Sequence, residues 1–448
     1  MSRVLHRAGA PQLPIAVRGD GCYVIDKEGK RYLDGSGGAV VSCLGHSHPR
    51  IREAIHQQVD RLAYTHASMF STEPMEELAS LLVGEASGEL AKAYFVSGGS
   101  EATEAALMIS RHFWAVQGGA HKRWFISRKS SYHGFTTGSL GVSGAPYRRQ
   151  HYECILPPAN LISRCFPYRD RPEGESLEMY GQRMADELET KIIDLGPENV
   201  VAFIAETVVG ASLGAVAAPP GYFKRIRSIC DRHDVLLILD EVLCGCGRTG
   251  TSYAFQQEQV RPDLVTIGKG LAAGYQPIGA VLIGHRVAQA LAAGASALRH
   301  GFTYSGHATA CAAALAVQQT LREEDLLPAV RRKGALLENI LRQRLGARPH
   351  VGDIRGRGLL WGVELVQDRD SKEPFAPVYR LHERVQKAAL RRGLLCYPMQ
   401  GALDGYRGDH IQIAPPYIVS EEQIEDLARI LEESIIDAVG QVHPGGRE

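Results

Sequence analysis

Short apolar runs without a polar-apolar alternation are the feature that most limits what this chain can fold into. They occupy residues 94–96, 124–126, 200–205, 235–239, 264–267 and 280–283. Segments with helical periodicity, among them residues 50–64 and 100–114, accompany them. Strands that read as continuous apolar runs are typical of a mainly parallel sheet that is covered on both faces. The sequence therefore predicts an α/β fold.

The two ends of the chain have a different pattern of predicted secondary structure. Residues 13–17, 22–25 and 31–33 read as short strands around turns, and charged helices over residues 321–345 precede a strand at 359–365. A capping box at Ser420 and Gln423 predicts a last helix that ends at Gly440. We interpret residues 1–47 and 321–448 as two parts of a smaller α+β domain, and residues 48–320 as the large domain. The charged segment 169–189 reads as an exposed helical insertion.

Composition excludes several classes of function. The chain has 50 Lys and Arg against 50 Asp and Glu, so it lacks the basic field that a nucleic-acid partner requires. No stretch of apolar residues is long enough to predict a membrane span. The nine cysteines are odd in number and dispersed, which favours a reducing compartment, and we expect a cytoplasmic protein. Cys244 and Cys246 lack a second pair at metal-binding spacing, so we expect no metal site.

Polar residues follow several of the apolar runs. Residues 97–100, Ser-Gly-Gly-Ser, lead directly into a helix, where free N–H groups could bind an anion or where the serine could simply cap the helix. Asp240 and Glu241 follow a wholly apolar strand, where a carboxylate is costly to bury without a partner. Lys269 follows another strand, and an aromatic and an imidazole occur within residues 131–134. Ligands of α/β sheets bind at such strand ends.

A glycine pattern at residues 245–250 matches the dinucleotide fingerprint GxGxxG. Its context is wrong, because the two acidic residues precede the glycines and Pro262 stops the short helical stretch that follows. We therefore do not expect a nicotinamide cofactor. The chain also lacks the GxxxxGK[ST] loop of phosphate-binding nucleotidases.

The strand-end residues together suit pyridoxal 5'-phosphate. That cofactor needs a lysine for a Schiff base, a carboxylate near the pyridine nitrogen, donors at a helix N-terminus for the phosphate, and a ring to stack on. The motifs FVSGGSEATEAAL, SYHGFT, LILDEV followed by GRTG, IGKGLAAGYQPIGA and HGFTYSGH, in this order, resemble the class III (omega) family of pyridoxal-phosphate aminotransferases. The resemblance covers nearly the whole chain.

The resemblance implies a fold and a set of roles. The fold would be pyridoxal-phosphate fold type I, with a mostly parallel seven-stranded sheet in the large domain and a small domain built from both termini. Lys269 would be the Schiff-base lysine and proton carrier, Asp240 would contact the pyridine nitrogen, and Glu206 would support the site. The further cofactor-binding residues would be Ser97, Gly98, Gly99, Ser100, Tyr132, His133, Gly134, Val242 and Thr303. Thr303 would reach the phosphate from a neighbouring subunit, which implies a homodimer or a dimer of dimers with shared active sites.

Departures from the family pattern bear on the substrate. Phe135, Leu243, Ala211 and Gln412 stand where relatives specialised for 4-aminobutyrate or acetylornithine carry their carboxylate clamps and gate. The resemblance is therefore to omega-transaminases that act on amines or omega-amino acids with a 2-oxo acid, most simply pyruvate. The substrate-pocket residues it implies are Val40, Met69, Phe70, Phe135, Ala211 and Arg407. Met69 and Phe70 could equally be interface packing, and Arg407 could equally be a solvated loop residue or a mobile carboxylate-binding cation.

Other activities would use the same cofactor-binding residues. A 2-oxoglutarate-dependent transaminase, a dialkylglycine decarboxylase, an aminomutase and a racemase remain open within the family. Outside it, a dimer that binds the cofactor without turnover is a distant alternative.

Overall fold

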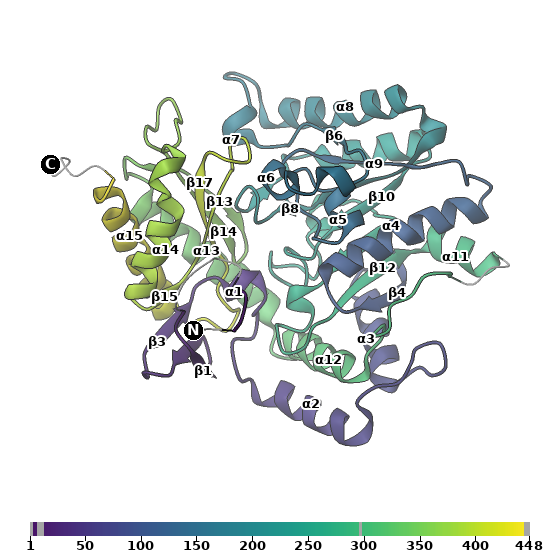
Figure 1. Cartoon of the computed structure of the whole chain (residues 1–448), viewed down its shortest axis with the longest axis horizontal. Coiled ribbons are helices and arrows are strands. Elements are labelled where there is room, and N and C mark those ends of the chain that lie inside the picture. Colours follow the sequence, from purple (N-terminus) through teal and green to yellow (C-terminus); the bar gives the residue numbers. More distant parts are fainter. Residues whose placement is uncertain (1–2, 7–12, 295–297, 443–448) are drawn as a thin grey trace.

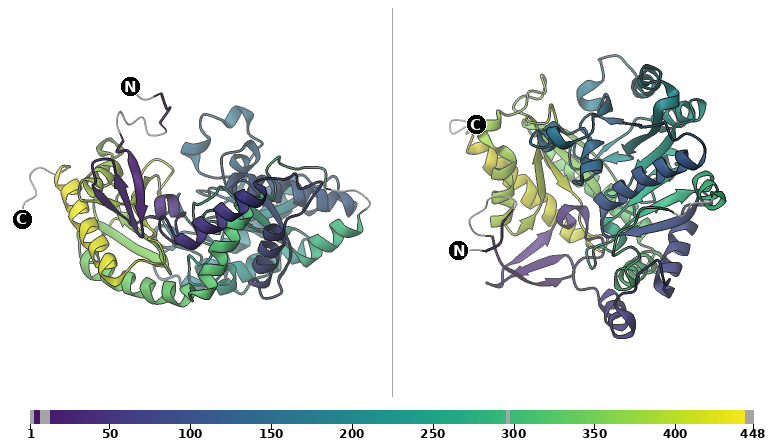
Figure 2. Two further views of the ribbon diagram at one scale, coloured as in Figure 1. Left: turned by 90° about the horizontal axis from the view of Figure 1, so that it is seen from below. Right: turned by 45° about the vertical axis from the view of Figure 1, so that its right-hand side comes forward.

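Two lobes make up the molecule (Figure 1). The computed structural model describes residues 3–6, 13–294 and 298–442. The larger lobe contains the middle of the chain, and the smaller lobe combines the first strands with the last helices, which lie side by side in both views of Figure 2.

A seven-stranded sheet forms the centre of the large lobe. Its strand order is β4-β12-β11-β10-β7-β5-β6. The strands are β4 (Leu90–Val96), β5 (Trp124–Arg128), β6 (Asn160–Ile162), β7 (Val200–Glu206), β10 (Leu236–Asp240), β11 (Leu264–Ile267) and β12 (Gly279–Gly284). Only β12 is antiparallel to its neighbours β11 and β4, while the other pairs are parallel. The predicted α/β fold with a mostly parallel seven-stranded sheet is confirmed.

Alternate side chains of the central strand β10 enter two different cores. Leu236 and Ile238 of β10 pack in the cluster that contains the buried face of α4 (Gly99–Val116). Leu237 and Leu239 pack in the cluster of α8 (Leu177–Leu195) and α9 (Tyr222–Arg232). Both faces are thus buried, which explains why the strands read as apolar runs, and each such side chain contributes about 1.5 to 3 kcal/mol.

The remaining elements of the large lobe surround this layer. The helices are α2 (Pro49–Leu62), α3 (Glu73–Gly84), α5 (Thr137–Gly141), α6 (Pro146–Arg149), α7 (Pro167–Asp170), α10 (Phe255–Glu258), α11 (His285–Ala293) and α12 (Ala308–Glu323). A two-stranded ribbon joins β8 (Val208–Val209) to β9 (Val216–Ala217). Short 3-10 helices occupy Glu153–Ile155, Pro197–Asn199 and Lys269–Leu271.

Two small sheets and three long helices build the small lobe. One sheet has the order β1-β2-β3-β15, with β1 (Ala16–Asp20), β2 (Tyr23–Asp26), β3 (Arg31–Asp34) and β15 (Leu394–Leu395). The other has the order β13-β14-β17-β16, with β13 (Val351–Arg357), β14 (Leu360–Leu365), β16 (Tyr397–Gln400) and β17 (Asp409–Ile413). The helices are α13 (Leu326–Leu345), α14 (Leu381–Arg391) and α15 (Glu421–Gly440), with α1 (Gly37–Val40) and the 3-10 turn Pro377–Tyr379 beside them. The predicted capping box of α15 is present, and the helix ends at Gly440 as expected.

Several local expectations differ from the structure. The first strand lies at Ala16–Asp20 rather than at residues 13–17. The sequence predicts segment 169–189 to be an exposed helical insertion; its helix is present and residues 170–179 are largely exposed, but exposure is wrong for residues 180–189. The segment forms most of α8, whose Tyr180, Met184 and Leu188 are buried in the core beside α9, because the charged residues occupy only the outer face. The domain limits at 47/48 and 320/321 stay predictions, and the second falls in the last turn of α12.

The glycine-rich loop at residues 245–250 holds the two lobes together. The Arg248 guanidinium donates to the carbonyl oxygens of Leu359 (3.0 Å) and Pro415 (2.6 Å). The Tyr417 hydroxyl donates to the carbonyl oxygen of Cys246 at 2.8 Å. The glycines therefore serve a turn that contacts the small lobe, and the helix that follows, α10, has only four residues.

Candidate active site

The parallel strands bring the predicted chemical residues to one edge of the sheet. In the strand register Asp240 pairs with Glu206 on one side and with Thr266 on the other. Lys269 follows two residues after the end of β11. The carboxyl ends of parallel strands share one edge, so Glu206, Asp240 and Lys269 converge although 63 residues separate the first from the last.

Asp240 is held between an imidazole and a backbone amide. Its Oδ2 lies 2.7 Å from Nδ1 of His133, and its Oδ1 accepts from the Val242 amide at 3.0 Å. The His133 backbone is fixed in turn, because its N–H donates to the Ser143 hydroxyl (2.9 Å) and its carbonyl accepts from the Thr103 hydroxyl (2.8 Å). Asp240 and His133 are both buried, so their orientation is set before any ligand binds.

Glu206 ties two loops to the same place. Its Oε1 accepts from the Tyr132 amide at 3.0 Å, and its Oε2 accepts from the Gly210 amide at 2.9 Å. Burial raises the pKa of Glu206, while the nearby His133 acts to lower it. The carboxyl group thus anchors the loop that carries Tyr132 and His133.

Lys269 has the features of a reactive amine. Its backbone has φ of 41°, in the left-handed region that residues other than glycine adopt only with strain. Burial lowers the pKa of the Lys269 amine, and the charges of Asp240 and Glu206 oppose that shift. Within the described ranges its side chain has no hydrogen-bond or ion-pair partner. An amine of this kind is more often neutral and nucleophilic than a solvated lysine.

The N-terminus of α4 offers an anion site beside this edge. The helix begins at Gly99 after Gly98, without a side-chain cap, so its first amides keep free donors. The Ser97 amide instead donates to Oε2 of Glu101 at 2.8 Å. The Ser100 hydroxyl accepts from the Phe135 amide at 3.0 Å, which joins the helix start to the loop of residues 131–135.

Close backbone approach shapes the space between these residues. A Cβ on Gly99 would lie 2.7 Å from Cγ1 of Val242, and one on Gly268 would lie 3.4 Å from the same atom. A Cβ on Gly134 would lie 2.7 Å from the Ser100 hydroxyl oxygen. Glycine is therefore required at Gly99 and Gly134, because a side chain there would displace the walls of the site.

Tyr132 supplies an aromatic ring at the same edge, and an unexpected cation lies over it. The guanidinium carbon of Arg148 is 4.3 Å from the centre of the Tyr132 ring. No sequence pattern predicts a role for Arg148, because adjacent arginines in a polar stretch are typical of solvated residues. In the structure both Arg148 and Arg149 are buried.

The residues present fit pyridoxal phosphate. A reactive lysine, a buried carboxylate oriented by histidine, a helix N-terminus with free donors and an aromatic ring all belong to one site. Two buried polar atoms there, His133 Nε2 and Thr266 Oγ1, have no partner among the described residues. The site can thus hold a polar ring with a phosphate and place a neutral amine beside it.

Glu241 has a different role from its neighbour Asp240. It accepts from the Thr207 hydroxyl at 2.9 Å and from the amides of Ala254 (2.7 Å) and Phe255 (2.6 Å). Burial raises the pKa of Glu241 to about 7. The second carboxylate therefore holds the loop after β10, a division of roles that the sequence could not decide.

The residues expected to line a substrate pocket differ in their burial, and their place in the pocket stays a prediction. Val40 is 2% exposed, with φ of 64°, and packs against Val208 and Leu360. Ala211 is buried, while Phe135 is partly exposed and meets Tyr152 edge to face at 5.7 Å.

The residues expected at a subunit interface lie on the surface. Met69 is 76% exposed and Phe70 is 67% exposed, and Thr303 is exposed as well. Met69 and Phe70 are adjacent in sequence and are both exposed, which is compatible with an interaction surface. Their proposed contacts with a second subunit stay predictions.

Two polar positions near the C-terminus were expected to matter for the substrate. Arg407 lies on the loop before β17, where its Nε donates to Oδ2 of Asp404 at 2.7 Å. Gln412, at the position of the family clamp, is fully buried, and neither its amide oxygen nor its amide nitrogen has a partner in the described part of the chain.

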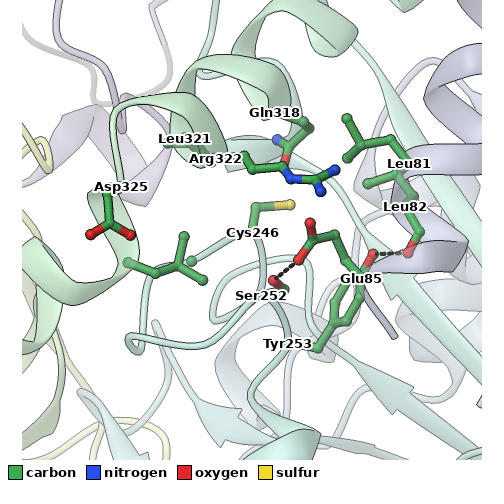
Figure 3. Close-up of a pocket in the computed structure, with 12 residues that line it drawn as sticks. Leu81, Leu82, Glu85, Cys246, Ser252, Tyr253, Gln318, Leu321, Arg322 and Asp325 are labelled. Carbon is green, nitrogen blue, oxygen red and sulfur yellow. Dashed lines mark hydrogen bonds between the residues drawn. The ribbon is translucent and has the colours of Figure 1, made fainter. Parts of the chain in front are cut away.

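A cavity of about 150 Å³ has a lining that includes none of Glu206, Asp240 and Lys269 (Figure 3). It is formed by α3, the loop at residues 246–253 and α12. Some of its polar groups are paired with each other, since Ser252 donates to Glu85 at 2.7 Å and the Tyr253 hydroxyl donates to the Leu82 carbonyl at 2.7 Å. The cavity offers no reactive group comparable with Lys269.

Two further searches cover the described residues. No cluster of three or more His, Cys, Asp or Glu side chains among them could hold a metal ion. None of their helices has both the length and the apolar character needed to cross a membrane.

Known proteins match this chain over nearly its whole length. The family model for class-III aminotransferases matches residues 5–435. An uncharacterized aminotransferase of Schizosaccharomyces pombe is 43% identical, over 95% of this chain and 93% of that protein. Gamma aminobutyrate transaminase 2 of Solanum lycopersicum is 34% identical, over 95% of this chain and 92% of that protein. The omega-transaminase of Pseudomonas jessenii, solved with PMP, superposes with a TM-score of 0.90 at 35% identity, covering 97% of this chain and 94% of that one.

Proposed function

The chain belongs to the class-III aminotransferase family, and from this premise we propose that it moves an amino group from a primary amine or omega-amino acid to pyruvate. The observation that carries the proposal is the meeting of Lys269 with the Asp240 and His133 pair beside the N-terminus of α4. Transfer would occur in two half-reactions, in which donor and acceptor use the same site in turn. We also propose pyridoxal 5'-phosphate as the cofactor, on which this family depends.

When bound, the cofactor supplies an electron-withdrawing ring and a carbonyl carbon that reacts with amines. The free amides at the start of α4 and the Ser100 hydroxyl would bind its phosphate. The Asp240 carboxylate, fixed by His133, would keep a proton on the ring nitrogen. Val242 and Tyr132 would contact the two faces of the ring.

Lys269 would carry the proton. Because burial lowers the pKa of Lys269, its Nζ gives up a proton more readily than the amine of a solvated lysine does. It would take a proton from the carbon on one side of the reacting nitrogen and deliver it to the carbon on the other side. The charge of Asp240, which favours the protonated amine, would stabilise Nζ while it holds that proton.

The choice of donor and acceptor rests on side chains. Ala211 and Gln412 leave no fixed pair of charges for a second carboxylate, which favours donors without an α-carboxylate. The likeness to a gamma-aminobutyrate transaminase and to an omega-transaminase supports donors of both kinds.

We further propose a homodimer with shared active sites, supported by the exposed Met69, Phe70 and Thr303. A cytoplasmic location is supported by nine cysteines that are all unpaired.

A matrix of donors and acceptors tests the proposal. Amines without carboxylates, omega-amino acids and α-amino acids would each be paired with pyruvate and with 2-oxoglutarate, and the amino-acid product would be measured. We expect alanine from pyruvate with amines or omega-amino acids. Glutamate as the dominant product would contradict the proposed acceptor, and carbon dioxide release would favour a decarboxylase.

A further inference from the structure

Two adjacent arginines of α6 have opposite surroundings. Arg149 donates to the carbonyl oxygens of Leu140 (2.7 Å), Gly141 (2.9 Å) and Ser143 (3.0 Å), and it pairs with Glu153 at 2.8 Å. Arg148 is equally buried, at 5% exposure, yet its guanidinium has no hydrogen-bond or ion-pair partner in the described residues. Its Nε is fully enclosed without an acceptor.

An unpaired guanidinium in this position is costly. The Nε donor is enclosed and has lost water, and no described residue accepts a hydrogen bond from it or from the two terminal nitrogens. Among the described residues, the guanidinium is compensated by the rings of Tyr132 and Tyr147, whose centres lie 4.3 and 4.9 Å from the guanidinium carbon. Such contacts replace only part of what hydration supplies. The group is therefore set to receive an anion from outside the chain.

The cation lies in the neighbourhood of the reacting groups. Tyr132, on which it stacks, is bonded through its amide to Glu206 and precedes His133. The charge of Arg148 also lowers the pKa of the Lys269 amine, so the field of the guanidinium reaches that amine.

The other candidate cation, Arg407, already has a partner. A Cβ on Gly405 would lie 2.9 Å from Pro146, so the loop that bears Arg407 packs against α6. Arg407 is neutralised there by Asp404, whereas Arg148 has no ion pair with any carboxylate in the described part of the chain. Of the two arginines, only Arg148 offers a whole guanidinium to a ligand.

We propose that Arg148 binds the carboxylate of the 2-oxo acid and of the amino acid formed from it. This inference rests on the proposed function and names the recognition element of the same site. A guanidinium fits a carboxylate with two parallel hydrogen bonds, and the stacked Tyr132 fixes its plane. An amine without a carboxylate has no group for Arg148 to bind, so its half-reaction does not depend on this residue.

Single-turnover measurements of the two half-reactions test the proposal in the holoenzyme. For Arg148→Gln we expect kcat/KM for pyruvate to fall about ten- to a hundredfold, with the amine half-reaction within about threefold of wild type. Arg148→Lys keeps the positive charge but cannot form two parallel hydrogen bonds to a carboxylate. Its kcat/KM for pyruvate should lie between the values of the wild type and of Arg148→Gln. Binding of propionate to the holoenzyme, measured by calorimetry, should weaken in parallel.

Arg123→Gln is the matched control. Arg123 stacks on Trp124 at 4.7 Å, but it lies at the opposite end of β5 from Tyr132, and its variant should behave as wild type. Thermal unfolding of each variant separates loss of folding from loss of carboxylate recognition. If Arg148→Gln does not fold, the comparison of the two half-reactions is made with Arg148→Lys.

Three results would overturn the inference. Unchanged pyruvate kinetics in both Arg148 variants would do so, as would an equal loss in both half-reactions. Weaker retention of cofactor phosphate would assign Arg148 to the cofactor instead. A wild-type protein that transaminates nothing would overturn the proposed function itself, which is a different outcome.

Discussion

Replacing Asp240 by asparagine should separate cofactor binding from catalysis. The variant keeps the size of the side chain, and its amide can still donate to His133 Nδ1 and accept from the Val242 amide if the imidazole changes tautomer. What is lost is the charge. The loss removes one influence that raises the pKa of Lys269, so the amine becomes more readily neutral and should still attach the cofactor.

The size of the effect follows from the burial of the charge. A carboxylate interacts with a positive group about 4 Å away by roughly 4 kcal/mol at the effective dielectric constant of a protein. Removing one preorganised charge contact typically costs about 3 to 4 kcal/mol in the transition state, or about a hundred- to a thousandfold in rate. We expect Asp240→Asn to lose activity in this range.

A single-turnover reaction with a reactive amine, monitored by the visible absorbance of the bound cofactor, measures the cofactor occupancy and the reaction rate together. Glu241→Gln is the control, because it changes an adjacent buried carboxylate that contacts Thr207 and the loop after β10. Its rate should stay within about tenfold of wild type. The reasoning is refuted if Asp240→Asn with full cofactor occupancy loses tenfold or less, or if Glu241→Gln loses as much.

Three further outcomes are expected. Lys269→Ala should remain folded by circular dichroism, yet show no turnover and no absorbance from lysine-bound cofactor; a wild-type rate would remove Lys269 from the site. Because Thr303 is proposed to act across an interface, activity should vanish with dimers on dilution, as sedimentation and rate measured together would show; fully active monomers would contradict this. The folded state raises the pKa of Glu241 from 4.5 to about 7, so stability from this group is greatest below pH 4.5 and is lost as the pH rises to 7. Denaturant unfolding should therefore show the difference between wild type and Glu241→Gln changing by up to about 3 kcal/mol across that range, and a constant difference would exclude the shift.

The strands and long helices were predictable because their patterns are local. The runs ending at Glu206 and Asp240 are apolar on both faces, and the capping box at Ser420 marks the start of α15 without reference to the rest of the fold. The three-residue strand β6 was not predicted, because so short a segment shows no periodic pattern of apolar and polar residues. The predicted exposure is wrong for residues 180–189, because the charged residues of α8 occupy its outer face while its apolar face packs beside α9.

The residues of the site also differ in how far the sequence predicts them. Lys269 and Asp240 could be predicted as site residues because each follows an apolar run. A polar group at the end of a buried strand is costly to bury unless it has a partner or a function. The separation of Asp240 from Glu241 was not visible, since it depends on which side of the chain faces Thr207 and Ala254. Arg148 was hidden because its significance is the absence of a partner in the described structure, which no sequence motif records.

Tracing the nitrogen itself tests the central claim most directly. The wild-type protein would be given an amine with an isotopically labelled nitrogen together with unlabelled pyruvate, and the alanine and ammonia formed would be analysed by mass spectrometry. The account predicts that the label appears in alanine in an amount equal to the carbonyl compound formed from the amine, and that Lys269→Ala yields none. Label released as ammonia, or alanine formed without it, would contradict amino transfer through this site.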